Sequence, residues 1–217
     1  MLTFPQSTEY VKRIPKTRFY EHLSVGAEIK RLFIDQINTI IWLHKFSPET
    51  LALVTGKRVK EIQIIQIKLN QKEIDQRVLS LIDKGIPYHL VFLLTHQDQS
   101  KLCMAFKEKT TNKEHYGIGR YFETPWLNDD QISLEINGLD LDVVCDNFLR
   151  QIAGNALNTQ ENGTVDLKDT IEKQDVRDKL KKQIVVLEKK RDNEKQFNRQ
   201  VELNAELRKL KEMLNCL

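Results

Sequence analysis

The stretch Glu61–Leu69, EIQIIQIKL, combines the isoleucine content of a β-strand with polar residues at alternate positions. Side chains two residues apart point to the same face of a strand, so Gln66 and Lys68 would share a face. A lysine beside a metal-bound acid can stabilise the charge that develops when a phosphodiester is hydrolysed. Glu49 is the acid that precedes this region. The pattern raises the hypothesis of an Mg²⁺-dependent nuclease site formed by Glu49, Gln66 and Lys68.

Nucleases with the restriction-endonuclease fold place two acids and a lysine on a mixed sheet flanked by helices. Here the segment Thr50–Val54, which is expected to be the neighbouring strand, contains no acid. Glu61 would point to the opposite face from Gln66. In the alternative interpretation the stretch is a core strand covered on both sides, and Lys68 extends its ammonium group to water. The sequence favours the core strand and keeps the nuclease as an alternative.

The surrounding elements are expected to form a layered domain over residues 24–154. Apolar residues at spacings of three and four predict a helix over 25–44. A strand over 50–54, a turn over 55–58 and a strand over 59–69 would make a hairpin. A helix from Asn70 to Gly85 follows, then strands over 86–94, 102–106, 115–123 and 132–136, and a helix over 139–153. This order predicts an α/β fold with a mixed or antiparallel sheet flanked by helices.

Residues 1–23 are expected to form a basic N-terminal arm, interrupted by two prolines. Its cations are Lys12, Arg13, Lys16 and Arg18. Together with the neighbouring Phe19 and Tyr20, they could contact nucleic-acid phosphates and bases. The alternative is a solvated arm that its apolar residues hold against the domain. The sequence leaves direct DNA binding open.

Residues 155–169 are polar and are expected to be a linker, followed by a coiled-coil helix over 170–217. From Thr170 to Leu217 there are 13 Lys and Arg and 9 Asp and Glu, an excess of four positive charges within a chain of net charge +3. The predicted oligomerisation seam consists of Leu180, Ile184, Leu187, Leu203, Leu207, Leu210, Leu214 and Leu217. Its two halves do not join into one heptad frame, which indicates a stutter. The seam is expected to bind a second copy or another protein, and the alternative is that it folds back over the globular domain.

Composition excludes several classes of site. The three cysteines are far apart, the five histidines are scattered, and neither a CxxC pair nor a phosphate-binding loop is present. No metal site or cofactor is therefore expected, apart from Mg²⁺ under the nuclease alternative. No apolar run is long enough to cross a membrane, and no signal-peptide core is present. These features predict a cytoplasmic protein.

Four segments of the chain resemble a family of bacterial domains of unknown function about this length. The matching segments are KRIPKTRFYEHL at 12–23, VKEIQIIQIKLNQKEID at 59–75, IPYHLVFLL at 86–94 and EKQFNRQVELNAELRKLKEML at 194–214. The resemblance implies a setting beside DNA methyltransferases and helicase-type translocases in restriction or phage-defence loci. It transfers no catalytic residue.

Together these features predict a non-enzymatic accessory subunit of such a system, which bridges protein partners through its coiled coil. The alternative function is a metal-dependent nuclease of degenerate restriction-endonuclease type.

Overall fold

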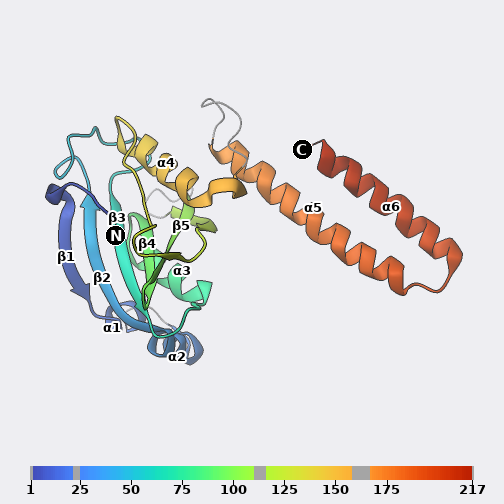
Figure 1. Ribbon diagram of the computed structural model, residues 1–217, viewed down its shortest axis with the longest axis horizontal. Helices are drawn as coiled ribbons and strands as arrows, with labels where there is room; N and C mark the ends of the chain where they lie inside the picture. The colour runs from blue at the N-terminus through green and yellow to red at the C-terminus, as the bar shows by residue number, and fades with distance from the viewer. Residues whose placement is uncertain (1, 22–24, 110–115, 158–166, 217) are drawn as a thin grey trace. The chain divides into compact units, whose positions relative to one another are not determined.

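The computed structural model describes residues 2–21, 25–109, 116–157 and 167–216. The chain divides into two compact units, Met1–Gly154 and Asn155–Leu217 (Figure 1). Most of the expected linker, residues 158–166, lies outside the described residues. Each unit is therefore described by itself.

A seven-stranded mixed sheet forms the centre of the first unit. Six strands follow the sequence order β1-β2-β3-β4-β5-β6, and β7 pairs with β5. Among the described pairs, β3 and β4 run parallel and the others antiparallel. The strands are β1 (Glu9–Ile14), β2 (Ile37–Phe46), β3 (Ile62–Leu69), β4 (His89–His96), β5 (Gln99–Lys109), β6 (Tyr116–Glu123) and β7 (Leu127–Asn128). The predicted α/β class with a mixed sheet is confirmed.

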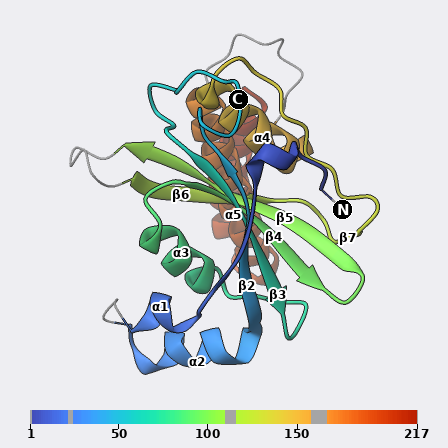
Figure 2. The same cartoon turned by 90° about the vertical axis from the view of Figure 1, so that its left-hand side faces the viewer.

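Helices cover both faces of this sheet (Figures 1 and 2). Three of them, α1 to α3, lie on one face and α4 lies on the other. The helical segments of this unit are η1 (Gln6–Thr8), α1 (Thr17–Tyr20), α2 (Ala27–Gln36), α3 (Gln76–Gly85) and α4 (Leu141–Ala153), and the short η2 (Gly154–Ala156) follows α4. A mixed sheet with helices on both faces buries most of its central strands.

The core confirms that β3 is covered on both sides. On the face of α3, Ile65 and Ile67 are fully buried in one cluster with Val78. On the face of α4, Phe148 packs on Phe46 of β2 with ring centroids 5.8 Å apart. The isoleucine-rich composition of β3 is therefore the consequence of burial on both faces.

The predicted helix over 25–44 is wrong in its second half, because α2 ends at Gln36 and β2 begins at Ile37. Asn38 and Thr39 are weak helix formers, and the β-branched and aromatic residues that follow them favour a strand. Since β2 is apolar on both faces, its isoleucines also fit helical spacing by coincidence. The helical spacing of these isoleucines therefore led to the prediction of a helix where the structure has a strand.

The predicted hairpin over 50–69 is also wrong, because residues 47–61 form a loop and β3 pairs with β2. The expected turn wraps around Asp142 of α4. The Asp142 carboxylate accepts hydrogen bonds from the backbone N–H groups of Lys57, Arg58 and Val59 at 2.7–3.2 Å. A side chain at Gly56 would collide with this carboxylate. Gly56 therefore leaves room for the Asp142 carboxylate, which the backbone amides bind. We call this contact between the loop and α4 the Asp142 anchor.

Smaller differences concern element ends. The strands expected over 86–94, 102–106 and 115–123 correspond to β4, β5 and β6, but residues 132–136 form no strand. Helix α3 begins at Gln76 and not at Asn70, with Asp75 as its N-cap accepting from the Arg77 N–H. Gly154 follows α4 with φ of 48°, the left-handed conformation that favours glycine.

A buried polar group ties α3 to β5 and β6. Lys107 Nζ lies 2.7 Å from Asp83 Oδ1 and donates to the Tyr88 carbonyl at 2.6 Å. The Tyr121 hydroxyl donates to the other Asp83 oxygen at 2.7 Å. Burial raises the pKa of Asp83, and Lys107 and Tyr121 counteract this shift. Because both charged side chains are inaccessible to water, removal of one would leave the other buried and unpaired.

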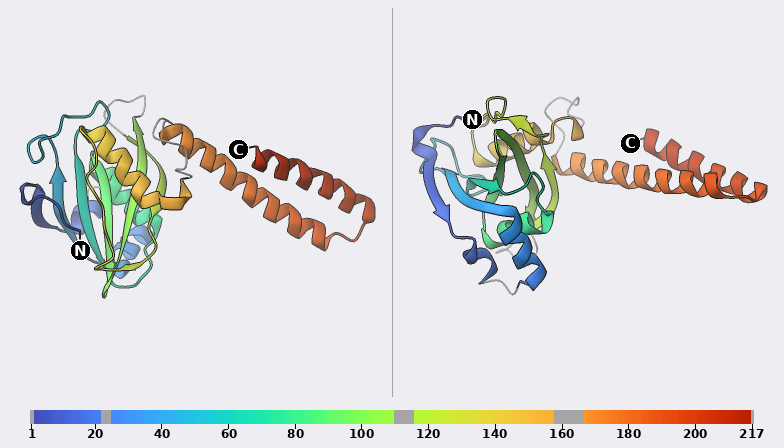
Figure 3. Two further views of the ribbon diagram at one scale, coloured as in Figure 1. Left: turned by 45° about the horizontal axis from the view of Figure 1, so that its top comes forward. Right: turned by 60° about the horizontal axis from the view of Figure 1, so that its bottom comes forward.

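The second unit is a pair of helices, α5 (Leu167–Asn193) and α6 (Phe197–Asn215), that run antiparallel side by side (Figures 1 and 3). The expected continuous helix is thus broken at residues 194–196. Of the predicted seam, Leu180, Ile184, Leu203 and Leu207 are buried, while Leu187, Leu210 and Leu214 are half-buried. Leu217 lies outside the described residues. Part of the expected oligomerisation seam is therefore used within one chain.

Glu194 organises the break between the two helices. Its carboxylate accepts from the backbone N–H groups of Gln196 and Lys195 at 3.0 and 2.9 Å, and its carbonyl accepts from the Gln200 side chain at 2.6 Å. The hydrogen bond from Gln196 is the main reason why the pKa of Glu194 is lowered. Lys211 of α6 also pairs with Glu188 of α5 at 2.7 Å. The polar middle of the tail is thus a turn, where the sequence suggested a stutter.

Within the described residues, none of the helices combines the length and the apolar character of a membrane span.

The burial of His89 at the start of β4 predicts an acid-sensitive fold. Burial, followed by the charges of Lys107 and Arg58, lowers the pKa of His89 from 6.5 to about 3. The neutral ring therefore contributes stability fully above about pH 6.5, and this contribution is lost as the pH falls toward the folded-state value. We expect the free energy of unfolding to fall by up to about 1.4 kcal/mol per pH unit below pH 6. Denaturant unfolding of the intact protein at several pH values measures this slope.

A His89→Gln variant is the control for this measurement. It should show a shallower loss of stability between about pH 6 and pH 4. Parallel pH profiles for the two proteins would contradict the role of His89.

Candidate functional site

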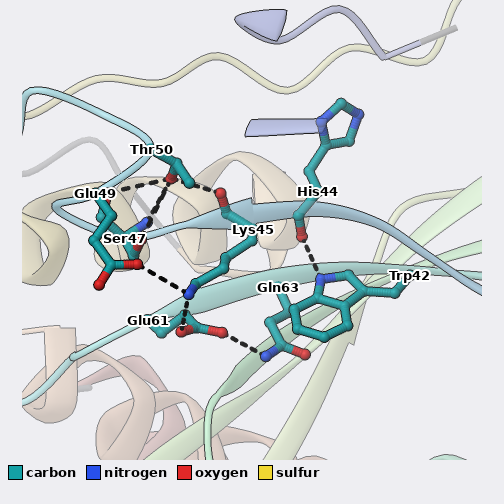
Figure 4. Close-up of polar contacts among 8 residues, drawn as sticks. All are labelled: Trp42, His44, Lys45, Ser47, Glu49, Thr50, Glu61 and Gln63. Carbon is teal, nitrogen blue, oxygen red and sulfur yellow. Dashed lines mark hydrogen bonds and ion pairs between the residues drawn. The ribbon is translucent and has the colours of Figure 1, made fainter. Parts of the chain in front are cut away.

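Four polar side chains form a cluster where β2 ends and β3 begins (Figure 4). Lys45 Nζ lies 3.4 Å from Glu49 Oε2 and 3.5 Å from Glu61 Oε2. The Gln63 amide nitrogen donates to Glu61 Oε1 at 2.5 Å. We call Lys45, Glu49, Glu61 and Gln63 the Lys45 cluster.

A β-bulge in β2 brings this cluster together. Trp42 lies opposite Ile65, but His44 lies opposite Ile64, so Leu43 is an extra residue in the ladder. Lys45 then lies opposite Gln63, on the same face as Trp42. In a regular strand, residues three apart would point to opposite faces. The bulge therefore places an aromatic ring and an amine on one face, beside Glu61 and Gln63.

The turn after β2 positions Glu49. The Thr50 hydroxyl donates to the Lys45 carbonyl at 2.7 Å and accepts from the Ser47 N–H at 3.0 Å. This closed turn returns the chain toward Lys45, so that Glu49 reaches the amine across one turn of backbone (Figure 4). The Glu49 side chain itself is 82% exposed, and its ion pair therefore contributes little stability.

Electrostatics keep Lys45 charged. Partial burial lowers the pKa of Lys45, but the carboxylates of Glu61 and Glu49 outweigh this effect and raise it overall. Glu61 and Gln63 are 8% and 3% exposed, so a cation beside them offsets the cost of burying the Glu61 charge. An ammonium group held in this way is a poor base or nucleophile and a good partner for an anion.

Glu61 also fixes the orientation of Gln63. An ionised carboxylate can only accept hydrogen bonds, so the Gln63 side chain must turn its NH₂ group toward Glu61. The amide oxygen of Gln63 therefore points away from the Lys45 cluster. Within the part of the chain that the structure describes, this oxygen has no hydrogen-bond partner.

A pocket of about 410 Å³ adjoins Gln63, and we call it the basic pocket. It lies between β1, α1, the segment after α3 and the β2–β3 pair. Its chemically distinctive lining residues are Lys12, Arg13, Arg18, Phe19, Trp42, Gln63 and Tyr88. Gln63 thus belongs to both the Lys45 cluster and the basic pocket, which makes them one continuous site.

Three of the four predicted nucleic-acid-binding cations meet at this pocket. The segment expected as an irregular arm contains η1, β1 and α1, and Lys12, Arg13 and Arg18 line the pocket. Lys16 instead donates to the Ile37 carbonyl at 2.6 Å and fixes the segment to the start of β2. Residues 22 and 23 lie outside the described residues.

The edge strand β1 is bulged as well. Glu9 lies opposite His44 and Lys12 opposite Trp42, so β1 holds one more residue than β2 between these pairs. Val11, within this bulge, has φ of 37°, which is strained for a β-branched residue. The bulge directs Lys12 to the face of Trp42 and Gln63. Bulged strands and strained residues are frequent at functional sites.

The structure does not bring the predicted catalytic residues Glu49, Gln66 and Lys68 together. Gln66 lies opposite Ile41, and the exposed Lys68 lies opposite Thr39, toward the far end of β3. Glu49 and Glu61 instead both pair with Lys45. Glu61 precedes Gln66 by five residues, a distance of about 16 Å along a strand. A catalytic role for these residues stays a prediction. That role assumed that the three side chains lie close together, and the structure places Glu49 apart from Gln66 and Lys68.

The residues that sequence reasoning missed are Trp42, Lys45, Gln63 and Tyr88. Trp42 lies in the segment predicted as a helix, and Lys45 follows directly after that segment. The two side chains share a face because of a β-bulge, which no local sequence pattern shows. Glu61 and Gln63 could be recognised in the sequence as two polar residues on one face of a predicted strand. Since that strand was expected to be covered on both sides, their expected burial was the available signal. Among the described residues, no group of three or more His, Cys, Asp or Glu side chains gathers in a way that could hold a metal ion.

The Lys45 cluster predicts a stability effect. In a Lys45→Met variant, Glu61 would remain buried without a cation, which we expect to cost about 2 kcal/mol of unfolding free energy at pH 7. Chemical denaturation at pH 7 measures this value.

Glu49→Gln is the matched control, because it removes the exposed partner of the same amine. Its effect should stay below about 0.5 kcal/mol. Equal losses for both variants would contradict the buried role of the Lys45–Glu61 pair.

Comparison with known proteins gives one match, at the level of a family. No curated protein and no solved structure matches the chain. A family model described as "Domain of unknown function (DUF4391)" matches residues 2–214. Because this match extends over nearly the whole chain, the protein belongs to the DUF4391 family of domains of unknown function.

Proposed function

We propose that the protein is a non-enzymatic accessory subunit of a bacterial restriction or phage-defence system, which bridges a protein partner and DNA. The observation that carries the proposal is an apolar groove on the helix pair of the second unit. The setting in a defence locus rests on the sequence resemblance described above. The basic pocket supports the contact with DNA.

The groove has a volume of about 480 Å³ and lies between α5 and α6. Val186, Leu187 and Leu210 form its apolar part, and Lys182, Gln183 and Glu206 form its polar rim. Val186 is 64% exposed although it is a β-branched apolar residue. Two antiparallel helices bury only one face each, so a third helix laid along this groove would bury the apolar residues that remain exposed.

Charge decides which partner fits. Residues 170–217 carry four more positive than negative charges, so a second copy would bring like charges together. An amphipathic helix with acidic flanks would meet a complementary surface. We therefore assign the groove to an acidic amphipathic helix of another protein, and self-association is the competing outcome.

Val186→Glu should abolish capture of the partner, because it places a carboxylate in the groove opposite the acidic helix. The partner is identified by affinity capture of the intact protein from its native host, followed by a binding titration with the purified partner segment. We expect at least a tenfold weaker Kd for the variant. Val186 is exposed, so the fold should not be affected.

Val201→Glu is the matched control, since it introduces the same charge at an exposed valine of α6 that does not line the groove. It should bind as the unmodified protein does. Light scattering that shows a dimer, disrupted by Val186→Glu, would overturn the assignment to another protein.

A second candidate function is the metal-dependent nuclease, and one observation favours it. Glu49 and Glu61 converge on Lys45 beside a basic pocket, which gives two acids and a lysine in one place. A divalent cation would have to displace the Lys45 ammonium from the carboxylates. Gln66 and Lys68 lie apart from this cluster, toward the far end of β3.

If the nuclease alternative holds, the purified protein should nick supercoiled DNA with Mg²⁺ or Mn²⁺. Lys45→Met should reduce the rate at least a hundredfold, and Lys68→Ala should leave it unchanged. Gel assays of both variants, with and without the captured partner, test this outcome. Loss of nicking in Lys68→Ala alone would return the site to the far end of β3, and no nicking in any mixture would exclude the nuclease.

A further inference from the structure

The basic pocket has the composition of a site for one nucleotide. We propose that it binds a phosphorylated nucleotide, with the base against the aromatic side chains of Trp42 and Tyr88 and the phosphate against Lys12 and Arg18. The nucleotide is either a free molecule or the 5′-phosphorylated end of a single strand. The volume of about 410 Å³ lies in the range of small-ligand sites.

The phosphate half of the site follows from unpaired positive charge. Within the described residues, Lys12 and Arg18 form no ion pair, whereas Arg58 and Arg77 of the same unit each contact a carboxylate. The pocket lining contains no acidic side chain among the described residues, and the Glu61 carboxylate that Gln63 contacts is paired with Lys45 at 3.5 Å. The pocket therefore keeps a net positive potential, which favours a phosphate group.

The base half of the site follows from an immobilised aromatic ring. The Trp42 indole N–H donates to the His44 carbonyl at 2.9 Å, and Tyr10 packs against the ring at an interplanar angle of 34°, with centroids 4.1 Å apart. These two contacts fix the ring before any ligand arrives, which reduces the entropy lost on binding. Stacking of a base on such a ring is tolerant of sequence, because every base has an aromatic face.

The buried amide of Gln63 supplies the third element. Gln63 is 3% exposed, lines the pocket, and has its NH₂ group committed to Glu61. Its amide oxygen is thus a fixed acceptor for an N–H or O–H donor of a ligand. A nucleotide offers such donors on the edge of its base and on its sugar. A polar group buried to this extent at the wall of a cationic and aromatic pocket favours a ligand that is both polar and planar.

This inference deepens the DNA contact in the proposed function. It uses the first unit alone, while the protein partner is assigned to the helix pair. Failure of nucleotide binding and failure of partner capture are therefore separate results.

Tryptophan fluorescence of the intact protein tests the proposal. The chain contains two tryptophans, so a Trp126→Phe background leaves Trp42 as the reporter. The ligands are AMP, adenosine, inorganic phosphate, and a short single strand with and without a 5′-phosphate. We expect saturable quenching by AMP or by the phosphorylated strand, and at least tenfold weaker binding of adenosine and of phosphate alone. The tighter of the two phosphorylated ligands identifies the source.

Two variants test the two halves of the site. Lys12→Gln combined with Arg18→Gln should weaken AMP binding at least tenfold and reduce its dependence on salt. Gln63→Met should weaken it about fivefold without changing the salt dependence, a difference that loss of fold would not produce. Arg31→Gln removes an exposed cation outside the pocket and is the matched control.

Three results would overturn the proposal. The first is the absence of saturable quenching by every ligand. The second is binding of inorganic phosphate as tight as that of AMP, which would reduce the pocket to a general anion site. The third is unchanged AMP binding in the Lys12→Gln, Arg18→Gln variant.

Discussion

The candidate site depends on one extra residue in β2. Leu43 occupies a bulge, and this single insertion rotates the rest of the strand so that Lys45 shares a face with Trp42. Without it, the amine would point toward α4, and Glu61 would be a buried carboxylate without a cation. The indole N–H of Trp42 donates to the carbonyl of His44, next to the bulge. The irregularity thus shapes both the electrostatics of the cluster and the position of the aromatic wall.

Buried and exposed charges have different roles in this protein. Pairs such as Arg31–Asp35 and Arg208–Glu212 lie on helix surfaces, where water and salt screen them. The Lys107–Asp83 pair is buried and helps to determine how α3 meets the sheet. The Lys45–Glu61 pair lies between these cases and holds an uncharged amide in one orientation. The amide oxygen of Gln63 is thereby held in a fixed direction as a hydrogen-bond acceptor at the wall of the basic pocket.

Local sequence patterns predicted those parts of the fold that depend on local contacts and burial. Strands β4 to β6, helix α4 and the two-sided burial of β3 followed from apolar runs and alternation. The junction between Gln36 and Ile37 did not, because an apolar run can fit a helix or a strand. The bulge at Leu43 and the Asp142 anchor depend on partners distant in the chain, and no periodicity encodes them. Within the site, the cations of β1 and α1 were predicted, while Lys45 and Trp42 required the register of β2 on β3.

The Asp142 anchor has a consequence for the order in which the chain can fold. The backbone amides of Lys57, Arg58 and Val59 converge on a carboxylate that lies more than 80 residues later in the sequence. During synthesis, the loop that carries Glu49 leaves the ribosome long before α4 exists. The conformation of its Lys57–Val59 end is therefore settled only when α4 docks, a late closure of a long chain segment. The anchored end of this loop is completed last, whereas the turn that positions Glu49 and the pairing of β1, β2 and β3 require only residues that are already present.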